Sequence, residues 1–253
     1  MRGRVFRLSL GFALVSSLLA QNNRQEFTHR LVGAALDRPN HTVRYHSAYV
    51  SIPYPGGDVP ADTGVCTDEI IRIYRVLRID LQKEVHEDMV NNLSAYPHKW
   101  KWLTTHTDTN IDHRRVPNLM VFFSRHGESL PVSLRADDYA PGDLVTWELS
   151  NGAPHIGILV DTKSALTGRY LIVHNIGQGP KMEDVLFDWK ITGHYRYFGP
   201  HTWLLPRYSP IVFFRYGLKV LRLAAGNAES FPGTGTEMLG QEHDLSDVQS
   251  IVC

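Results

Sequence analysis

Three residues of this chain could together carry out nucleophilic chemistry: Cys66, His155 and His174. A thiol attacks an amide carbonyl when a base takes its proton and a third group orients that base. Cys66 would be the nucleophile, His155 the base, and His174 the group that fixes the imidazole tautomer. The backbone N–H of Cys66 would stabilise the developing oxyanion. The alternative for either histidine is a core imidazole whose hydrogen bonds are satisfied.

Cys66 follows a loop rich in glycine and proline, residues 54–64, and opens an expected helix. The residues that recur at helical spacing after it are Ile70, Ile73, Tyr74 and Leu77. This spacing places Cys66 on the same inward face, at the end where the helix dipole favours a thiolate. Asp68 and Glu69 oppose that effect, so a second activating group is needed. The alternative is a buried structural cysteine.

The segments 155–160 and 170–175 predict the two strands of an antiparallel hairpin. A register that opposes their strongest apolar side chains puts His155 and His174 side by side on the other face. Gly157 shares that face and leaves room for a close approach. A slip of one residue would bring Asn175 beside His155 instead. We prefer His174, and Asn175 stays open as the third residue.

The remaining periodic segments complete a mixed pattern. Helices are expected over 25–36 and 81–93, extended chain over 47–52, and strands over 144–149 and 191–198. Residues 108–118 contain four formal charges of both signs, two amides and a histidine beside an apolar run. This segment is either a solvated loop with local Asx hydrogen bonds or a wall that recognises a polar ligand.

Composition limits the classes of function. The chain has 253 residues, no formal net charge and 43% hydrophobic residues, which suits one globular domain without the basic surface that nucleic acid requires. Thirteen histidines include no pair with the spacing of metal ligands on a helix, so we expect neither a metal nor another cofactor. Cys66 and Cys253 are the two cysteines, and a bridge between them is the structural alternative to a reactive thiol.

The N-terminus predicts export. Arginines at 2, 4 and 7 precede an apolar run over 8–19 and a polar segment, the pattern of a secretory signal peptide over residues 1–20. The expected location is periplasmic or extracellular, and an uncleaved membrane anchor is the alternative. We divide the rest into an N-terminal extension (21–44), a catalytic domain (45–198) and a C-terminal appendage (199–253).

The motifs in order resemble a known superfamily. They are Tyr54-x-Gly-Gly, Asp-x-Gly-Val-Cys66-Thr-Asp, Tyr139-x-Pro-Gly-Asp143-Leu-Val, His155-Ile-Gly-Ile and Leu171-Ile-Val-His174-Asn. This series is similar to the NlpC/P60 superfamily of papain-like cell-wall cysteine peptidases. The phrases Val-His86-Glu-Asp-Met, Asn110-Ile-Asp-His-Arg-Arg and Ile191-Thr-Gly-His-Tyr-Arg look like its DUF1287 branch. The resemblance covers residues 45–198.

The resemblance implies an α+β, papain-like fold in which a helix with the nucleophile packs on an antiparallel sheet with the base. The family's nucleophile, base and third polar residue then fall on Cys66, His155 and His174, and its tyrosine near the oxyanion site falls on Tyr54. The family's usual Asp-Cys-Ser-Gly is Val65-Cys-Thr-Asp68 here, so we expect a different pocket floor. Candidate substrate-binding residues are Asp68, Asn110, Asp112, His113, Arg114 and Asn175.

Two functions from different classes follow. The first is a cysteine hydrolase that cleaves amide bonds, with peptidoglycan stem peptides as the substrate that the resemblance implies and another amide as the alternative. The second is a module on the same fold that binds the cell wall or a polar ligand without cleaving it. Cell-wall specificity rests on analogy between members of the superfamily.

Overall fold

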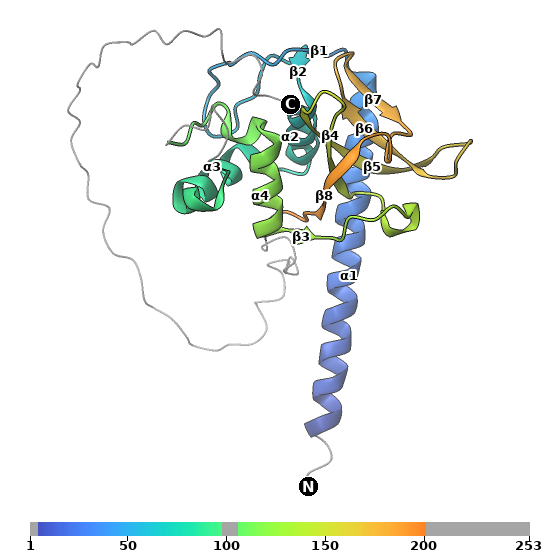
Figure 1. The fold of residues 1–253 in the computed structure, drawn as a ribbon. Coiled ribbons are helices and arrows are strands. Elements are labelled where there is room, and N and C mark those ends of the chain that lie inside the picture. The colour runs from blue at the N-terminus through green and yellow to red at the C-terminus, as the bar shows by residue number, and fades with distance from the viewer. Residues whose placement is uncertain (1–4, 98–105, 201–253) are drawn as a thin grey trace, which may run out of the picture.

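The computed structural model describes residues 5–97 and 106–200, with side chains described from residue 20 onward. The four α-helices of this part are α1 (Val5–Asp37), α2 (Cys66–Val76), α3 (Leu81–Asn92) and α4 (Val116–His126). Short 3-10 helices occupy Arg38–Asn40, Leu93–Ala95, Asp112–Arg114 and Ala136–Asp138. The helices α2, α3 and α4 gather beside the sheet, while the N-terminal part of α1 extends beyond the rest of the fold (Figure 1).

Six strands form one antiparallel sheet in the order β3-β8-β4-β5-β6-β7. Their bounds are β3 (Glu128–Ser129), β4 (Leu144–Glu148), β5 (Pro154–Lys163), β6 (Tyr170–Asn175), β7 (Pro180–Glu183) and β8 (Lys190–Arg196). A separate two-stranded parallel pair joins β1 (Arg44–Tyr45) and β2 (Thr63–Gly64) ahead of α2. The α+β class with an antiparallel sheet is therefore confirmed.

The expected elements around the nucleophile form as predicted. The helix α2 begins at Cys66 itself, α3 occupies the second amphipathic segment, and β4 follows the turn that ends at Asp143. The segment 47–52 contains no strand. The helix α4 was missed because Pro117 and the charges before it suggested a loop. Proline fits here because it lies in the first turn, where a backbone N–H has no helical partner.

The β5–β6 hairpin has the register that its apolar side chains favour. Ile158 pairs with Val173 and Leu159 pairs with Ile172. Ile156, Ile158 and Val173 pack in a large core cluster with α1, α2 and α4. Leu159 and Ile172 pack in a second cluster with Trp147 from β4. The sheet thus buries both faces, and α2 covers the face that carries the isoleucines.

The part of the chain predicted as an N-terminal extension contributes to the main core. Phe27, Leu31 and Ala35 of α1 are buried in the same cluster as α2. The helix expected over 25–36 is thus the end of the longer α1. Among the described residues, no helix combines the length and the hydropathy needed to cross a membrane. Export, the signal peptide over 1–20 and the domain boundaries stay predictions, and most of the appendage lies outside the described residues.

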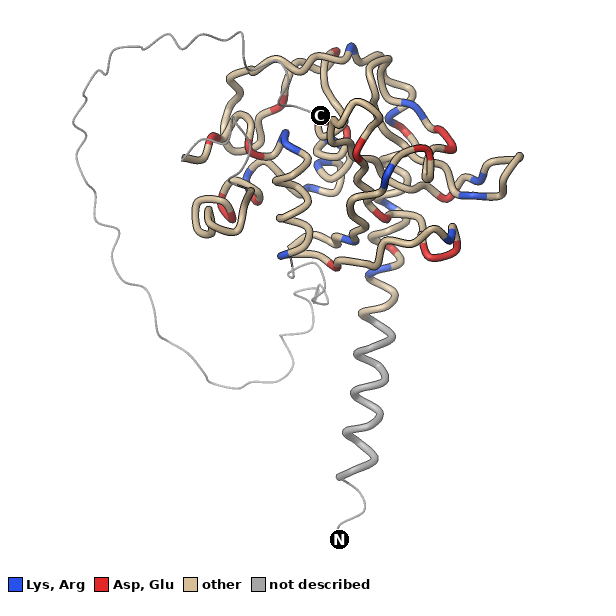
Figure 2. Tube along the Cα trace, viewed as in Figure 1, with Lys and Arg blue, Asp and Glu red and all other residues tan. Residues whose placement is uncertain are grey.

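The charged residues of the described part are mixed in sign. Lysine and arginine are interspersed with aspartate and glutamate along the described trace, and neither sign gathers in one region (Figure 2).

A substitution at Ile158 tests the packing of β5 against the helices. Its side chain is fully buried in the large cluster, so Ile158→Ala should leave a cavity and lower the free energy of unfolding by about 2–5 kcal/mol. Chemical denaturation monitored by circular dichroism measures this loss. The control is Leu166→Ala in the exposed β5–β6 loop (96% exposed), for which a change of at most about 0.5 kcal/mol is expected. Equal losses in both variants would contradict the packing.

Candidate functional site

The two histidines of the predicted site lie in direct contact. Nε2 of His155 is 2.9 Å from Nδ1 of His174, and both side chains are 1% exposed. This contact follows from the hairpin register and confirms the choice of His174 as the neighbour of His155. Gly157 makes the arrangement possible, since a Cβ there would lie 2.6 Å from Cγ2 of Ile172 and 3.2 Å from Cβ of His174.

A carboxylate and two indoles complete the surroundings of the pair. Oε2 of Glu183, on β7, lies 3.1 Å from Nε2 of His174. Trp147 and Trp189 approach the His155 ring, each with centroids 5.9 Å apart. The sequence reading missed Glu183 and both tryptophans. For Glu183 a signal existed, because a further strand paired with β6 would have placed it near His174.

The environment holds both imidazoles neutral. Burial, together with the neighbouring His174, lowers the pKa of His155 to about 3. Burial also lowers the pKa of His174, while Glu183 acts in the opposite direction. A neutral imidazole is the form that accepts a proton, so His155 is in the state required of a base. Within the described residues its Nδ1 makes no hydrogen bond and is available to a reacting group.

Cys66 and the imidazole pair belong to different faces of β5. Cys66 packs in the large cluster with Ile156, whereas His155 alternates with it and lies against Trp147 of the second cluster. His155 is the second residue of β5. A thiol at the start of α2 can therefore meet this imidazole only around the end of the strand. The sequence did not reveal this constraint.

Cys66 is fully buried at the first position of α2 and takes part in a disulfide. The bridge to Cys253 was the structural alternative in the sequence, and Cys253 lies outside the described residues. A disulfide sulfur carries no thiol proton and is no nucleophile. Chemistry at Cys66 therefore requires its reduction.

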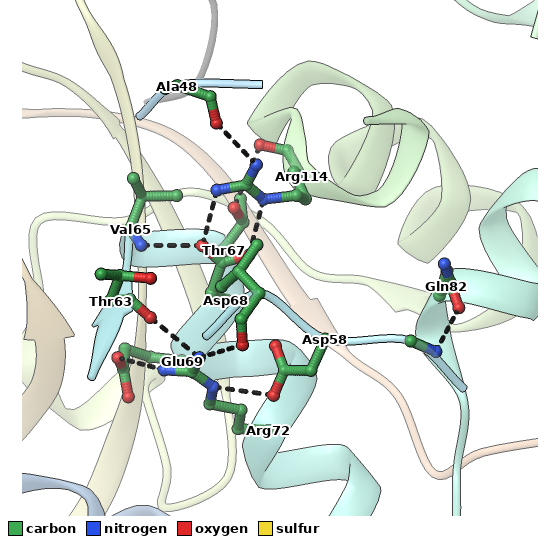
Figure 3. Close-up of polar contacts among 12 residues, drawn as sticks. Ala48, Asp58, Thr63, Val65, Thr67, Asp68, Glu69, Arg72, Gln82 and Arg114 are labelled. Atoms are coloured by element: carbon green, nitrogen blue, oxygen red, sulfur yellow. Dashed lines mark hydrogen bonds and ion pairs between the residues drawn. The ribbon is translucent and has the colours of Figure 1, made fainter. Parts of the chain in front are cut away.

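A buried ion pair organises the turn that carries Cys66. Nε and Nη2 of Arg114 donate to Oδ1 and Oδ2 of Asp68 at 2.9 and 3.0 Å, and both side chains are at most 2% exposed (Figure 3). Oδ2 of Asp68 also accepts a hydrogen bond from the backbone N–H of Val65 at 2.8 Å, which caps α2. The hydroxyl of Thr67 donates to the carbonyl of Arg114 at 3.0 Å. The polar groups of Asp68 and Arg114 thus face each other, and their substrate-binding role stays a prediction.

The polar segment 108–118 is buried over most of its second half, while Asp108 at its start accepts local hydrogen bonds from Asn110. Asp112 and His113 are each 2% exposed. Asp112 accepts hydrogen bonds from the backbone N–H of Asp108 and from His86 of α3, both at 2.9 Å. Asn110 is partly exposed, and its Oδ1 accepts from the backbone N–H of Ile52 at 2.9 Å. Asp112 and His113 are thus buried, and their role in ligand binding stays a prediction.

The last two predicted residues have separate surroundings. Tyr54 is 38% exposed and its ring contacts the edge of His86, with centroids 5.1 Å apart, so it packs toward α3. Its predicted place near the oxyanion site stays a prediction. Asn175 is fully buried; its Oδ1 accepts a hydrogen bond from the backbone N–H of Gly177, and its Nδ2 has no hydrogen-bond partner among the described residues. By alternation on β6, it faces the α2 side, away from His174.

Among the described residues, no group of three or more histidine, cysteine, aspartate or glutamate side chains is arranged to hold a metal ion.

Substitutions at Asp68 and Arg114 test whether their ion pair stabilises the fold. Asp68→Ala leaves a buried guanidinium without its carboxylate, so unfolding free energy should fall by about 3–5 kcal/mol. The double variant Asp68→Leu/Arg114→Met should lose less than the sum of the two single variants, since neither charge is stranded. Urea denaturation of all three variants measures the coupling. Glu87→Ala, which breaks the exposed pair with Lys83, is the control and should change stability by at most about 1 kcal/mol. Additive losses for Asp68 and Arg114 would show that the pair is not coupled.

The buried imidazole of His113 should make the stability of the fold depend on pH. Burial and the neighbouring Arg114 lower its pKa to about 3, against 6.5 for the free side chain. As pH falls from 6.5 toward 3, the unfolded chain takes up a proton that the folded chain does not, so stability decreases on acidification. Each such imidazole should remove roughly 1–2 kcal/mol between pH 7 and pH 5.

His113→Gln should therefore show a weaker loss of stability between these two pH values than the wild-type protein, whatever its absolute stability. Urea denaturation at pH 7 and pH 5 supplies the comparison. The control is His29→Gln, at an exposed position on α1, which should keep the wild-type difference. An unchanged difference in His113→Gln would mean that the pKa of this imidazole is similar in the folded and the unfolded protein.

Comparison with known proteins identifies a family, a curated relative and a solved structure that resemble this chain. The model of the family described as "Domain of unknown function (DUF1287)" matches residues 32–197. The "Uncharacterized protein YijF" of Escherichia coli (strain K12) is 54% identical over 157 residues, which cover 62% of this chain and 75% of that protein.

Among solved structures, NlpC1 from Trichomonas vaginalis is 18% identical with a TM-score of 0.36. The alignment covers 67% of this chain and 44% of that one, so it spans less than half of the solved chain. Assignment therefore rests on the family model, which covers more than half of the sequence and starts within α1, and on the match to YijF. The chain belongs to the DUF1287 family.

Proposed function

We propose that this protein is a papain-like cysteine hydrolase that cleaves amide bonds, with Cys66 as nucleophile and His155 as base. The observation that carries the proposal is the contact between two neutral, buried imidazoles, of which Nδ1 of His155 has no hydrogen bond within the described residues. The helix that begins at Cys66 packs on the same two strands, β5 and β6. Thiol catalysis needs this combination of a nucleophile at a helix start and an oriented base.

The proposed reaction has two stages. Nδ1 of His155 takes the proton of the reduced Cys66 thiol as the sulfur bonds to the amide carbonyl carbon, and the carbonyl oxygen becomes an oxyanion beside the start of α2. The C–N bond then breaks, and the imidazolium gives its proton to the leaving amine. Water, deprotonated by the same imidazole, attacks the thioester, and collapse of this second intermediate releases the carboxylic acid and restores the thiol.

We propose stem peptides of peptidoglycan, outside the cytoplasm, as the substrate class. The support is the ordered motif series around Cys66, His155 and His174, together with the exported N-terminus that the sequence predicts. The proposed site also needs a reduced Cys66 and a path around the end of β5.

The test is incubation of purified sacculi with the protein and a thiol reductant, followed by mass spectrometry of the released muropeptides. The wild-type protein should cleave a defined amide bond, and Cys66→Ala should reduce the rate by at least about 1,000-fold, the scale of loss for a catalytic nucleophile. Cys253→Ala is the matched control, because it removes the other cysteine, and it should retain activity. Cleavage by Cys66→Ala at the wild-type rate would falsify the proposal.

A second candidate function is a module that binds the cell wall without cleaving it. Two observations favour it: Cys66 is in a disulfide, and the imidazole pair lies on the other face of β5. In that case the reduced protein would release no muropeptides but would still sediment with sacculi. Slow alkylation of the reduced Cys66 by iodoacetamide, at the rate of an ordinary thiol, would also support binding without catalysis.

A further inference from the structure

In the described part of the molecule, three polar side chains on three neighbouring strands form a hydrogen-bonded row. His155 on β5 contacts His174 on β6, and His174 contacts Glu183 on β7. The two contacts use opposite nitrogens of His174: Nδ1 faces His155 at 2.9 Å and Nε2 faces Glu183 at 3.1 Å. We infer that Glu183 is a positioning residue that sets the tautomer of both histidines and so leaves the lone pair of His155 on Nδ1.

The donor and acceptor roles of the three side chains fix which ring nitrogens carry a hydrogen. A carboxylate only accepts hydrogen bonds, so Nε2 of His174 must carry a hydrogen and donate to Glu183. In a neutral imidazole the other nitrogen then has a lone pair, so Nδ1 of His174 accepts. Nε2 of His155 must be the donor to it. The one remaining nitrogen, Nδ1 of His155, is therefore an acceptor.

The opposite order of protons would disable the base. If Nε2 of His174 carried a lone pair, Nδ1 of His174 would donate to Nε2 of His155, and Nδ1 of His155 would hold a hydrogen. Such an imidazole cannot take a proton from a thiol at that nitrogen. Glu183 excludes this order because it would bring a lone pair against a carboxylate oxygen.

The location of Glu183 suits a residue that acts on His155 through His174. Its side chain is 40% exposed on β7, an edge strand of the sheet, whereas the side chain of His174 on the neighbouring β6 is buried. The other charged groups near His174 are Lys181 and Asp188. Nζ of Lys181 donates to Oε1 of Gln178 at 2.6 Å. Glu183 is the charged group that hydrogen-bonds the ring, and it stabilises positive charge that forms on the imidazole pair during proton transfer.

This inference rests on the proposed function for the role of His155 as a base, but its first test needs no substrate. Long-range ¹H–¹⁵N correlation spectra of the histidine rings at pH 7 report which nitrogen of each imidazole carries the hydrogen. In the wild-type protein His155 and His174 should both show a protonated Nε2 and an unprotonated Nδ1. A hydrogen on Nδ1 of His155 would overturn the inference.

Glu183→Gln supplies the second arm, since an amide can donate as well as accept and thus permits either order of protons. In this variant His155 should show a mixture of tautomers, and kcat on muropeptides should fall on the order of tenfold to a hundredfold with little change in KM. The matched control is Glu148→Gln, a surface glutamate on β4 that pairs with Lys190, which should leave both readouts unchanged. An unchanged His155 tautomer in Glu183→Gln would also overturn the inference.

The two arms separate this inference from the proposed function. If Cys66→Ala retains full activity while the tautomers respond to Glu183→Gln, the hydrolase mechanism fails and the positioning role stands. If activity depends on Cys66 but neither readout responds to Glu183→Gln, the hydrolase stands and the positioning role fails.

Discussion

The ion pair between Asp68 and Arg114 is the contact on which the arrangement around Cys66 depends. Asp68 lies in the first turn of α2 and caps the helix through the backbone of Val65. Arg114 also reaches the carbonyl of Ala48 at 3.3 Å, so three segments far apart in sequence meet at one guanidinium (Figure 3). Buried charges are stable only when they are paired and hydrogen-bonded. The start of α2 is therefore held by the cap from Asp68 and by the contacts of Arg114, which lies outside the helix.

The sheet divides the candidate site into an apolar side and a polar side. The α2 side of β5 and β6 consists mainly of isoleucine and valine, and it holds the helix through shape and burial. The other side holds the two imidazoles, with Glu183 and two tryptophans around them. Because side chains alternate along a strand, the residues that anchor the helix cannot also be the residues that carry protons. The two roles meet only where β5 begins.

Much of this was predictable from residue patterns, and the limits have physical causes. The start of α2 at Cys66 and the pairing of His155 with His174 follow from helical spacing and from strand alternation, which are local signals. The burial of Asp112, His113 and Arg114 was not predictable, because a charged segment looks solvated until its partners in α2 and α3 are known. The side of the sheet on which the imidazoles lie relative to Cys66 depends on how α2 docks. A single sequence carries no signal for that docking.

The ion pair also has a consequence for the order of folding. Asp68 and Arg114 are separated by 46 residues, and Arg114 and Ala48 by 66. Contacts of such sequence separation close long loops, and their entropic cost delays them relative to local helix formation. A nascent chain that has only formed its helices has not yet assembled the surroundings of its cysteine. The surroundings in which Cys66 is buried and disulfide-bonded are thus complete only when the tertiary structure is complete.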